Sequence, residues 1–101
     1  MIVVKLPSKQ VALTFRHPVV DSGRRATICR ILEQEPDVAN HWTMLSEGRV
    51  ECSQQNNFNK EVGRKLALER ALLRKDPFGN KCFGKNDRRI VWEHYFCRGL
   101  D

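Results

Sequence analysis

The chain has 101 residues, 41% hydrophobic and 30% charged, a composition typical of one small globular domain spanning residues 1–101. No apolar run approaches the roughly 20 residues that a membrane-spanning helix needs, and the start, MIVVKLPSKQ, lacks the pattern of a signal peptide, so we expect a cytoplasmic protein. Eighteen Lys and Arg against twelve Asp and Glu give a net charge of +6, which favours anionic partners: nucleic acid or the acidic face of another protein.

Short apolar or alternating runs in the first half predict β-strands. Three such runs are IVVKL at 2–6, VALTF at 11–15 and RATICRIL at 25–32. HWTMLSEGRVECS at 41–53 indicates one long strand bent at Glu47-Gly48, or two short strands joined there, because glycine within a strand often marks a bulge or turn. Sequential strands with short connections favour an antiparallel meander of three to four strands.

The stretch FNKEVGRKLALERALLRK, residues 58–75, predicts one long helix. Asn57 or Asn59 can cap its start. The helix should end near Arg74, because Pro77 and the glycine after it cannot continue a helix.

The last segment has two possible structures. Alternation over residues 88–98 is compatible with a strand, whereas Asp87 and Gly99 are a typical start and end for a helix, and these end signals favour the helix. The predicted fold class is therefore α+β: a small antiparallel sheet packed against one long helix, with a short C-terminal helix or strand.

A rotation of 100° per residue divides the long helix into two faces. Larger apolar residues share one arc, which we expect to lie on the sheet: Phe58, Val62, Leu66 and Leu73, with Leu68 and Leu72 at its margin. The opposite face has small residues along its middle and cations at its margins: Gly63, Ala67 and Ala71, with Lys60, Arg64, Arg70 and Arg74. Because glycine inside a helix costs about 1 kcal/mol relative to alanine, Gly63 suggests a close approach by another element.

The outer face has three possible explanations. It can be a solvated surface, a surface that a phosphate backbone approaches, or a docking surface for a protein. A following segment with two Phe-Gly pairs can extend it, since phenylalanines between lysines can stack on bases or anchor a loop on the core. The further candidate residues are Phe78, Lys81, Phe83, Lys85, Arg88 and Arg89.

Motifs for catalysis are not recognisable. The chain has no Gly-x-Ser-x-Gly, no phosphate-binding loop before a helix and no His-Glu-x-x-His, so we predict no enzyme and no cofactor. Cys29, Cys52, Cys82 and Cys97 form no C-x-x-C pair, which predicts reduced thiols. His94 lies three residues before Cys97, but this spacing is not typical of a zinc site, and we predict no metal.

Two resemblances concern the long helix. NKEVGRKLALERAL resembles the final helix of double-stranded-RNA-binding domains, which implies phosphate contacts by Lys60, Arg64 and Lys65. More broadly, a Phe-x-Lys-x-x-Gly-Arg-Lys-x-Ala-Leu run followed by Trp-x-x-Tyr resembles small uncharacterised proteins of bacteriophages and prophages. The matching residues are Cys52, Phe58, Lys60, Gly63, Arg64, Lys65, Ala67, Leu68, Trp92 and Tyr95.

These observations lead to two functional hypotheses. In the first, a small non-enzymatic phage or mobile-element protein in a bacterial host cell contacts DNA or RNA through the cationic helix face. In the second, the protein is an anti-defence inhibitor, similar to anti-CRISPR proteins. It would bind a host nuclease complex or another host protein with an acidic or RNA-containing surface. The oligomeric state is left open.

Overall fold

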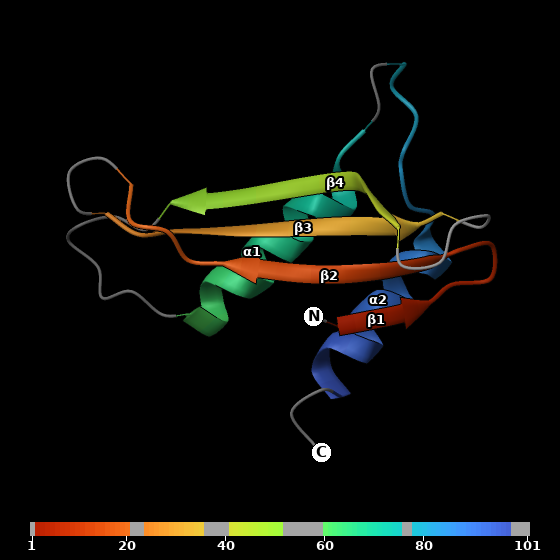
Figure 1. The fold of residues 1–101 in the computed structure, drawn as a ribbon, viewed down its shortest axis with the longest axis horizontal. Helices are drawn as coiled ribbons and strands as arrows, with labels where there is room; N and C mark the ends of the chain where they lie inside the picture. The colour runs from red at the N-terminus through yellow and green to blue at the C-terminus, as the bar shows by residue number, and fades with distance from the viewer. Residues whose placement is uncertain (1, 21–23, 36–40, 52–59, 76–77, 98–101) are drawn as a thin grey trace.

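A computed structural model describes residues 2–20, 24–35, 41–51, 60–75 and 78–97 (Figure 1). The elements follow in the order β1 (Ile2–Lys5), β2 (Gln10–Arg16), β3 (Ala26–Gln34), β4 (Trp42–Glu51), α1 (Lys60–Leu73) and α2 (Lys85–Cys97). The prediction of an α+β fold is confirmed, and the final segment is a helix.

The four strands form one antiparallel sheet in the order β1-β2-β3-β4, as expected for a meander. The predicted alternative of one long strand is confirmed, because β4 continues through Glu47 and Gly48, and the alternative of two short strands joined there is wrong. The irregularity lies earlier in β4. Ile31 pairs with Ser46 while Leu32 pairs with Met44, so one extra residue of β4 is accommodated there.

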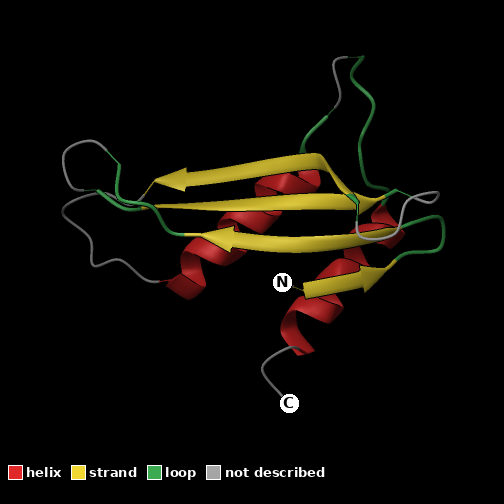
Figure 2. Cartoon of the chain, in the orientation of Figure 1, coloured by secondary structure: helices red, strands yellow, loops and turns green. Residues whose placement is uncertain are grey.

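Both helices cover the same face of the sheet (Figure 2). Figure 1 looks onto the opposite face, with α1 behind β3 and β4 and α2 behind β1. Side chains alternate between these two faces along each strand, and the inward set packs with the helices. Leu13, Cys29 and Ile31 are fully buried there, as is Tyr95 of α2, whose ring centroid lies 5.9 Å from that of Phe15.

The helix α2 begins two residues before the predicted cap. Its first turn is closed by the amide of Arg88, which donates to the carbonyl oxygen of Gly84 at 3.0 Å. Asp87 therefore lies within the first turn, where its charge is favourable to the helix dipole. The predicted helix boundaries at Asn57, Asn59, Pro77 and Gly99 lie outside the described residues.

Candidate functional site

The orientation of α1 is opposite to the one predicted. Gly63, Ala67 and Ala71, expected on the outer face, are buried against the sheet. The reason is the close approach of backbone to backbone. A Cβ atom added at Gly48 of β4 would overlap the carbonyl oxygen of Ala67 and the amide nitrogen of Ala71, and one added at Gly63 would overlap Thr27 of β3. Only small residues fit this contact, so the partner that approaches Gly63 closely is the sheet of the same chain.

Larger apolar side chains of α1 consequently point outward. Val62, Leu66 and Leu73 lie on one side of the helix and are 52%, 40% and 52% exposed. Phe96 of α2 is also exposed, at 55%, and is joined to α1 through Lys65, whose ammonium lies 5.5 Å from its ring centroid. We call Val62, Leu66, Leu73 and Phe96 the helical stripe. Phe58, predicted on the same arc, lies outside the described residues.

Arg64, which was predicted to contact a partner, is engaged by other side chains of this chain. Its guanidinium donates to the carboxylate of Glu61 at 2.7 Å, and the hydroxyl of Tyr95 donates to the same carboxylate at 3.2 Å. The hydrogen bond to Glu61 raises the pKa of Arg64, with a smaller contribution from Tyr95. This group of three side chains joins α1 to α2, so Arg64 has a structural role before any ligand is considered.

Arg70 and Arg74 cover the outer edge of the sheet. Arg70 donates to the carbonyl oxygen of Arg49 at 2.7 Å, and Arg74 donates to that of Glu47 at 3.0 Å. Because β4 is the last strand of the sheet formed by the described residues, no other described strand lies beside these carbonyl groups. The two guanidinium groups therefore satisfy edge acceptors and hinder the addition of another strand.

The remaining predicted site residues lie beyond or near the ends of the helices. Lys60, Lys81 and Lys85 are exposed, and exposed Arg89 donates to Asn86 at 3.0 Å. Arg88 is half-buried, with one guanidinium nitrogen buried and without a hydrogen-bond partner among the described residues.

The phenylalanines of the two Phe-Gly pairs, Phe78 and Phe83, differ in solvent exposure. Phe78 is 88% exposed, whereas Phe83 is fully buried in the core, so for Phe83 the predicted alternative of an anchor on the core is confirmed and its prediction as a binding residue is wrong. The ammonium of Lys9 lies 5.2 Å from the Phe83 ring centroid. Phe83 lies two residues before the first residue of α2, and its burial in the core anchors the start of that helix.

Positive charge is concentrated in the helical part of the chain. Residues 60–97 contain ten Lys and Arg against five Asp and Glu, a net +5, whereas residues 1–59 contain seven against six, a net +1. Among the described residues, the two helical segments have ten Lys and Arg against four Asp and Glu, a net +6, and the segments that form the sheet have seven against four, a net +3, so the helical layer is the more basic.

The pKa of one histidine, His17, is affected by several of these cations. His17 follows β2, and its Nδ1 lies 3.1 Å from the hydroxyl of Thr27. Burial lowers the pKa of His17 below its ordinary value of 6.5, and the charges of Arg64, Lys60 and Arg25 lower it further. Cations from the start of α1 and the start of β3 thus gather at this end of the sheet.

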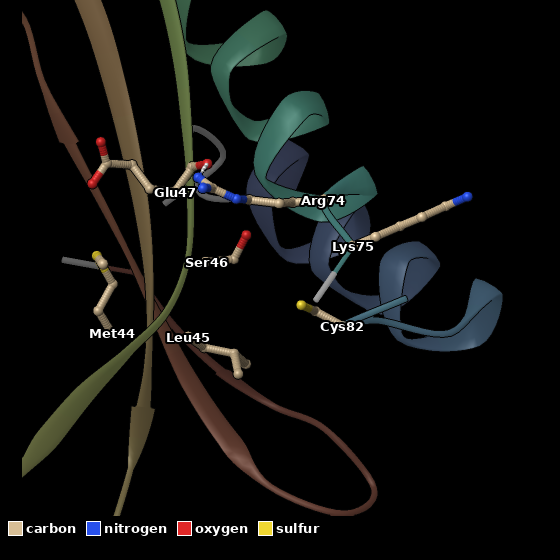
Figure 3. A pocket seen from close by; sticks show the side chains of 7 residues that line it. All are labelled: Met44, Leu45, Ser46, Glu47, Arg74, Lys75 and Cys82. Atoms are coloured by element: carbon tan, nitrogen blue, oxygen red, sulfur yellow. Dashed lines mark hydrogen bonds between the residues drawn. The ribbon is translucent and has the colours of Figure 1, made fainter. Parts of the chain in front are cut away.

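A hollow of about 600 Å³ lies between β4 and the end of α1 (Figure 3). Its lining comprises Met44, Leu45, Ser46, Glu47, Arg74, Lys75 and Cys82. Figure 3 shows the side chains of Met44 and Glu47 on the other side of β4 and that of Lys75 directed away. The hydroxyl of Ser46 donates to the carbonyl oxygen of Ala71 at 2.6 Å, so the polar groups nearest the hollow are engaged within the chain, and we assign no ligand to it.

The thiols show no arrangement for metal binding in the described part of the chain. No group of three or more His, Cys, Asp or Glu side chains lies close enough there to hold a metal ion. Cys29 is buried, and burial raises its pKa to about 12. Cys97 is exposed, and Cys52 lies outside the described residues.

Comparisons with known proteins found no match for the chain at any of three levels. No family model matches it, and no curated protein or solved structure matches it. Among the described helices, none is both long and apolar enough to cross a membrane. The resemblances to phage proteins and to double-stranded-RNA-binding domains therefore stay predictions.

Sequence reasoning missed the helical stripe as a surface. Its members are apolar, and the wheel of α1 alone places them on the core side. The signal that could have found them was Gly48, because a glycine in the middle of a long strand permits a close helix approach, which favours the small-residue face of the helix.

Proposed function

We propose that this protein is a non-enzymatic binding protein whose helical layer docks on an acidic, partly apolar surface of another protein. The exposure of the helical stripe carries this proposal. Three aliphatic side chains on one helix face are each at least 40% exposed, and exposed Glu69 lies on the same face between Leu66 and Leu73. Surfaces of this kind, with a polar rim, are typical of protein interaction sites.

Burial of the helical stripe on docking would contribute to the binding free energy. Full burial of a Val, Leu or Phe side chain contributes about 1.5–3 kcal/mol. Roughly half of each stripe residue is still exposed, so each can contribute about 1 kcal/mol more on docking. The four residues together contribute about 4 kcal/mol of apolar burial, less than a cluster of interface hot spots at about 2 kcal/mol or more each, so the surrounding charges must supply part of the affinity.

The charge around the stripe selects an acidic partner. Lys65 borders it beside Phe96, and Arg70 borders it toward β4. The helical part of the chain has a net charge of +5, so a basic surface would be repelled and an acidic one attracted. If the phage resemblance holds, a host nuclease complex or another defence protein is the partner class that this docking would inhibit.

Nucleic acid is the second candidate, supported by the same net charge and by Phe78 near two exposed lysines. Phe78 is 88% exposed, and Lys81 and Lys85 follow it in the chain. Aromatic rings and cations together bind single strands without sequence preference. The burial of Gly63, Ala67 and Ala71 removes the small-residue surface that a phosphate backbone would have approached.

A capture experiment with matched variants tests the proposal. Immobilised wild type, Leu73→Glu and Val19→Glu are each exposed to nuclease-treated bacterial lysate. Leu73 and Val19 are 52% and 60% exposed, so the two substitutions add the same charge at similarly exposed positions, one on the stripe and one away from it. We expect a specific protein bound by wild type and Val19→Glu and lost from Leu73→Glu.

Titration of the captured protein, once purified, completes the test. We expect Leu73→Glu to weaken the affinity at least tenfold, or about 1.4 kcal/mol. Equal affinity of both variants would refute docking through the stripe. Capture that disappears on nuclease treatment, together with a shift of short DNA or RNA at about 50 mM salt that falls steeply at higher salt, would instead establish the second candidate.

A further inference from the structure

The face of the sheet opposite the helices has an apolar row that crosses all four strands. In the strand register, Val3 of β1 pairs with Ala12 of β2, Ala12 with Leu32 of β3, and Leu32 with Met44 of β4. Directly paired residues point to the same face. We call these four residues the apolar band. Among the described elements, no helix lies over them (Figure 1).

Both ends of the apolar band are exposed. Val3 is 42% exposed and Met44 is 56% exposed. Met44 also lies on the same side of β4 as the Glu47 side chain, away from the helices (Figure 3). Between these ends the row is already shielded, since Ala12 is fully buried and Leu32 is half-buried. An antiparallel sheet can leave one face in water, but contact with another layer would remove the exposed apolar surface of Val3 and Met44 from water.

From this geometry, we infer that the apolar band is the contact between two copies of this chain, which pair sheet to sheet with their helices outside. Charge decides in favour of a second copy at this face. In a symmetric dimer each copy contributes the same surface. Among the described residues, the helical segments 60–75 and 78–97 have ten Lys and Arg against four Asp and Glu, a net +6, and the segments that form the sheet have seven against four, a net +3. A contact between two sheet faces therefore brings together less positive charge than a contact between two helical layers.

The row next to the band is compatible with self-association. Arg30 and Glu47 form an ion pair at 3.1 Å on this face, so their charges are already balanced within one copy. A two-fold axis reverses the direction of the pair in the second copy. Each guanidinium can then lie nearer the partner's carboxylate than the partner's guanidinium, which is the arrangement that an isologous interface requires.

The area of the sheet sets the expected strength. Strands of 4, 7, 9 and 10 residues, at about 3.3 Å per residue and about 4.8 Å between strands, give a flat area of roughly 480 Å² per copy. Two copies bury roughly 950 Å², just below the 1,000 Å² or so expected of a specific interface. We therefore expect a weak dimer that dissociates on dilution.

Sedimentation over a range of protein concentrations tests the inference. Wild type should move from the 11.8 kDa monomer toward a species of twice that mass as its concentration rises. Met44→Glu places a charge in the band and should weaken dimerisation at least tenfold. Leu73→Glu adds the same charge at a similarly exposed residue of the helical stripe and should dimerise as wild type does.

Three results would overturn the inference. They are a wild type that stays monomeric at several hundred micromolar, equal dimerisation of Met44→Glu and wild type, and loss of the dimer in Leu73→Glu alone. Circular dichroism of each variant verifies its fold, and Val3→Glu, on the opposite edge strand, replaces Met44→Glu if that variant unfolds. The test involves a different face from the docking experiment, so either proposal can fail without the other.

Discussion

Replacement of Gly48 by alanine is the most direct test of how α1 sits on the sheet. The new Cβ atom would overlap the carbonyl oxygen of Ala67 and the amide nitrogen of Ala71. These are backbone atoms inside a helix, and they cannot rotate away as a side chain can. The helix must therefore move away from β4, which also loosens the packing of Leu68 and Leu72, both buried in the same contact.

The expected change in the free energy of unfolding of Gly48→Ala has two opposing contributions. If the new Cβ atom met no other atom, replacement of glycine by alanine within a strand would stabilise the protein by roughly 0.5–1 kcal/mol. Overpacking costs about 1–3 kcal/mol, and overlap with a helix backbone places Gly48→Ala at the upper end of that range. The expected net loss is about 2 kcal/mol, which lowers the Tm of a domain of this size by about 8–16 °C.

Thermal unfolding followed by circular dichroism measures this loss. The matched control is Gly84→Ala, because a Cβ atom at Gly84 meets no atom within 4 Å. That variant should stay within about 1 kcal/mol of wild type, since Gly84 only precedes the first turn of α2. If Gly48→Ala unfolds at or above the temperature of Gly84→Ala, then α1 does not approach β4 through its small residues, and the outward position of the helical stripe is refuted as well.

Three further predictions concern single side chains. Ser46→Ala should destabilise by about 1 kcal/mol in urea unfolding, because the hydroxyl satisfies the carbonyl oxygen of Ala71 in the last turn of α1; an unchanged midpoint would contradict this bond. With a thiol reagent at mildly alkaline pH, exposed Cys97 should react before unfolding, whereas Cys29, whose pKa is raised to about 12, should react only after it. Because the pKa of His17 is lowered on folding, the unfolded chain binds more protons below the ordinary value of 6.5, so stability should fall as the pH falls from there. Replacement of His17 by asparagine should reduce that slope in unfolding experiments at pH 8 and below 6, and an identical slope would show that another group is responsible.

The elements could be predicted from the sequence, but the rotation of α1 could not. Periodicity and end signals are local, and they identified the four strands and both helices. The buried face of a helix depends on what lies beneath it. Here a glycine of β4, distant in the sequence from α1, admits Ala67 and Ala71 and leaves Leu66 and Leu73 outside. A helix wheel ranks faces by hydrophobicity and contains no information about this contact.

Only part of the candidate site could be predicted from the sequence, because the roles of several residues depend on tertiary contacts. The exposed cations Lys60, Lys81 and Lys85 could be recognised as surface residues from their type alone. The roles of Arg70 and Arg74 depend on the position of β4 at the edge of the sheet, which no local pattern reveals. Phe78 and Phe83 occur in equivalent Phe-Gly pairs, and only the tertiary fold distinguishes the exposed ring from the buried one.

The two arginines on the edge of β4 also have a consequence for biosynthesis. All four strands leave the ribosome before α1 does, and Arg70 and Arg74 belong to that later segment. Until α1 docks, the outer strand of the nascent sheet has unsatisfied carbonyl groups and its core side is in water. Such a chain is open to pairing with its neighbours. We therefore expect yield in the cell to depend on how soon α1 folds after synthesis. Variants that slow docking of α1, Gly48→Ala among them, should accumulate in inclusion bodies even where the purified protein remains folded.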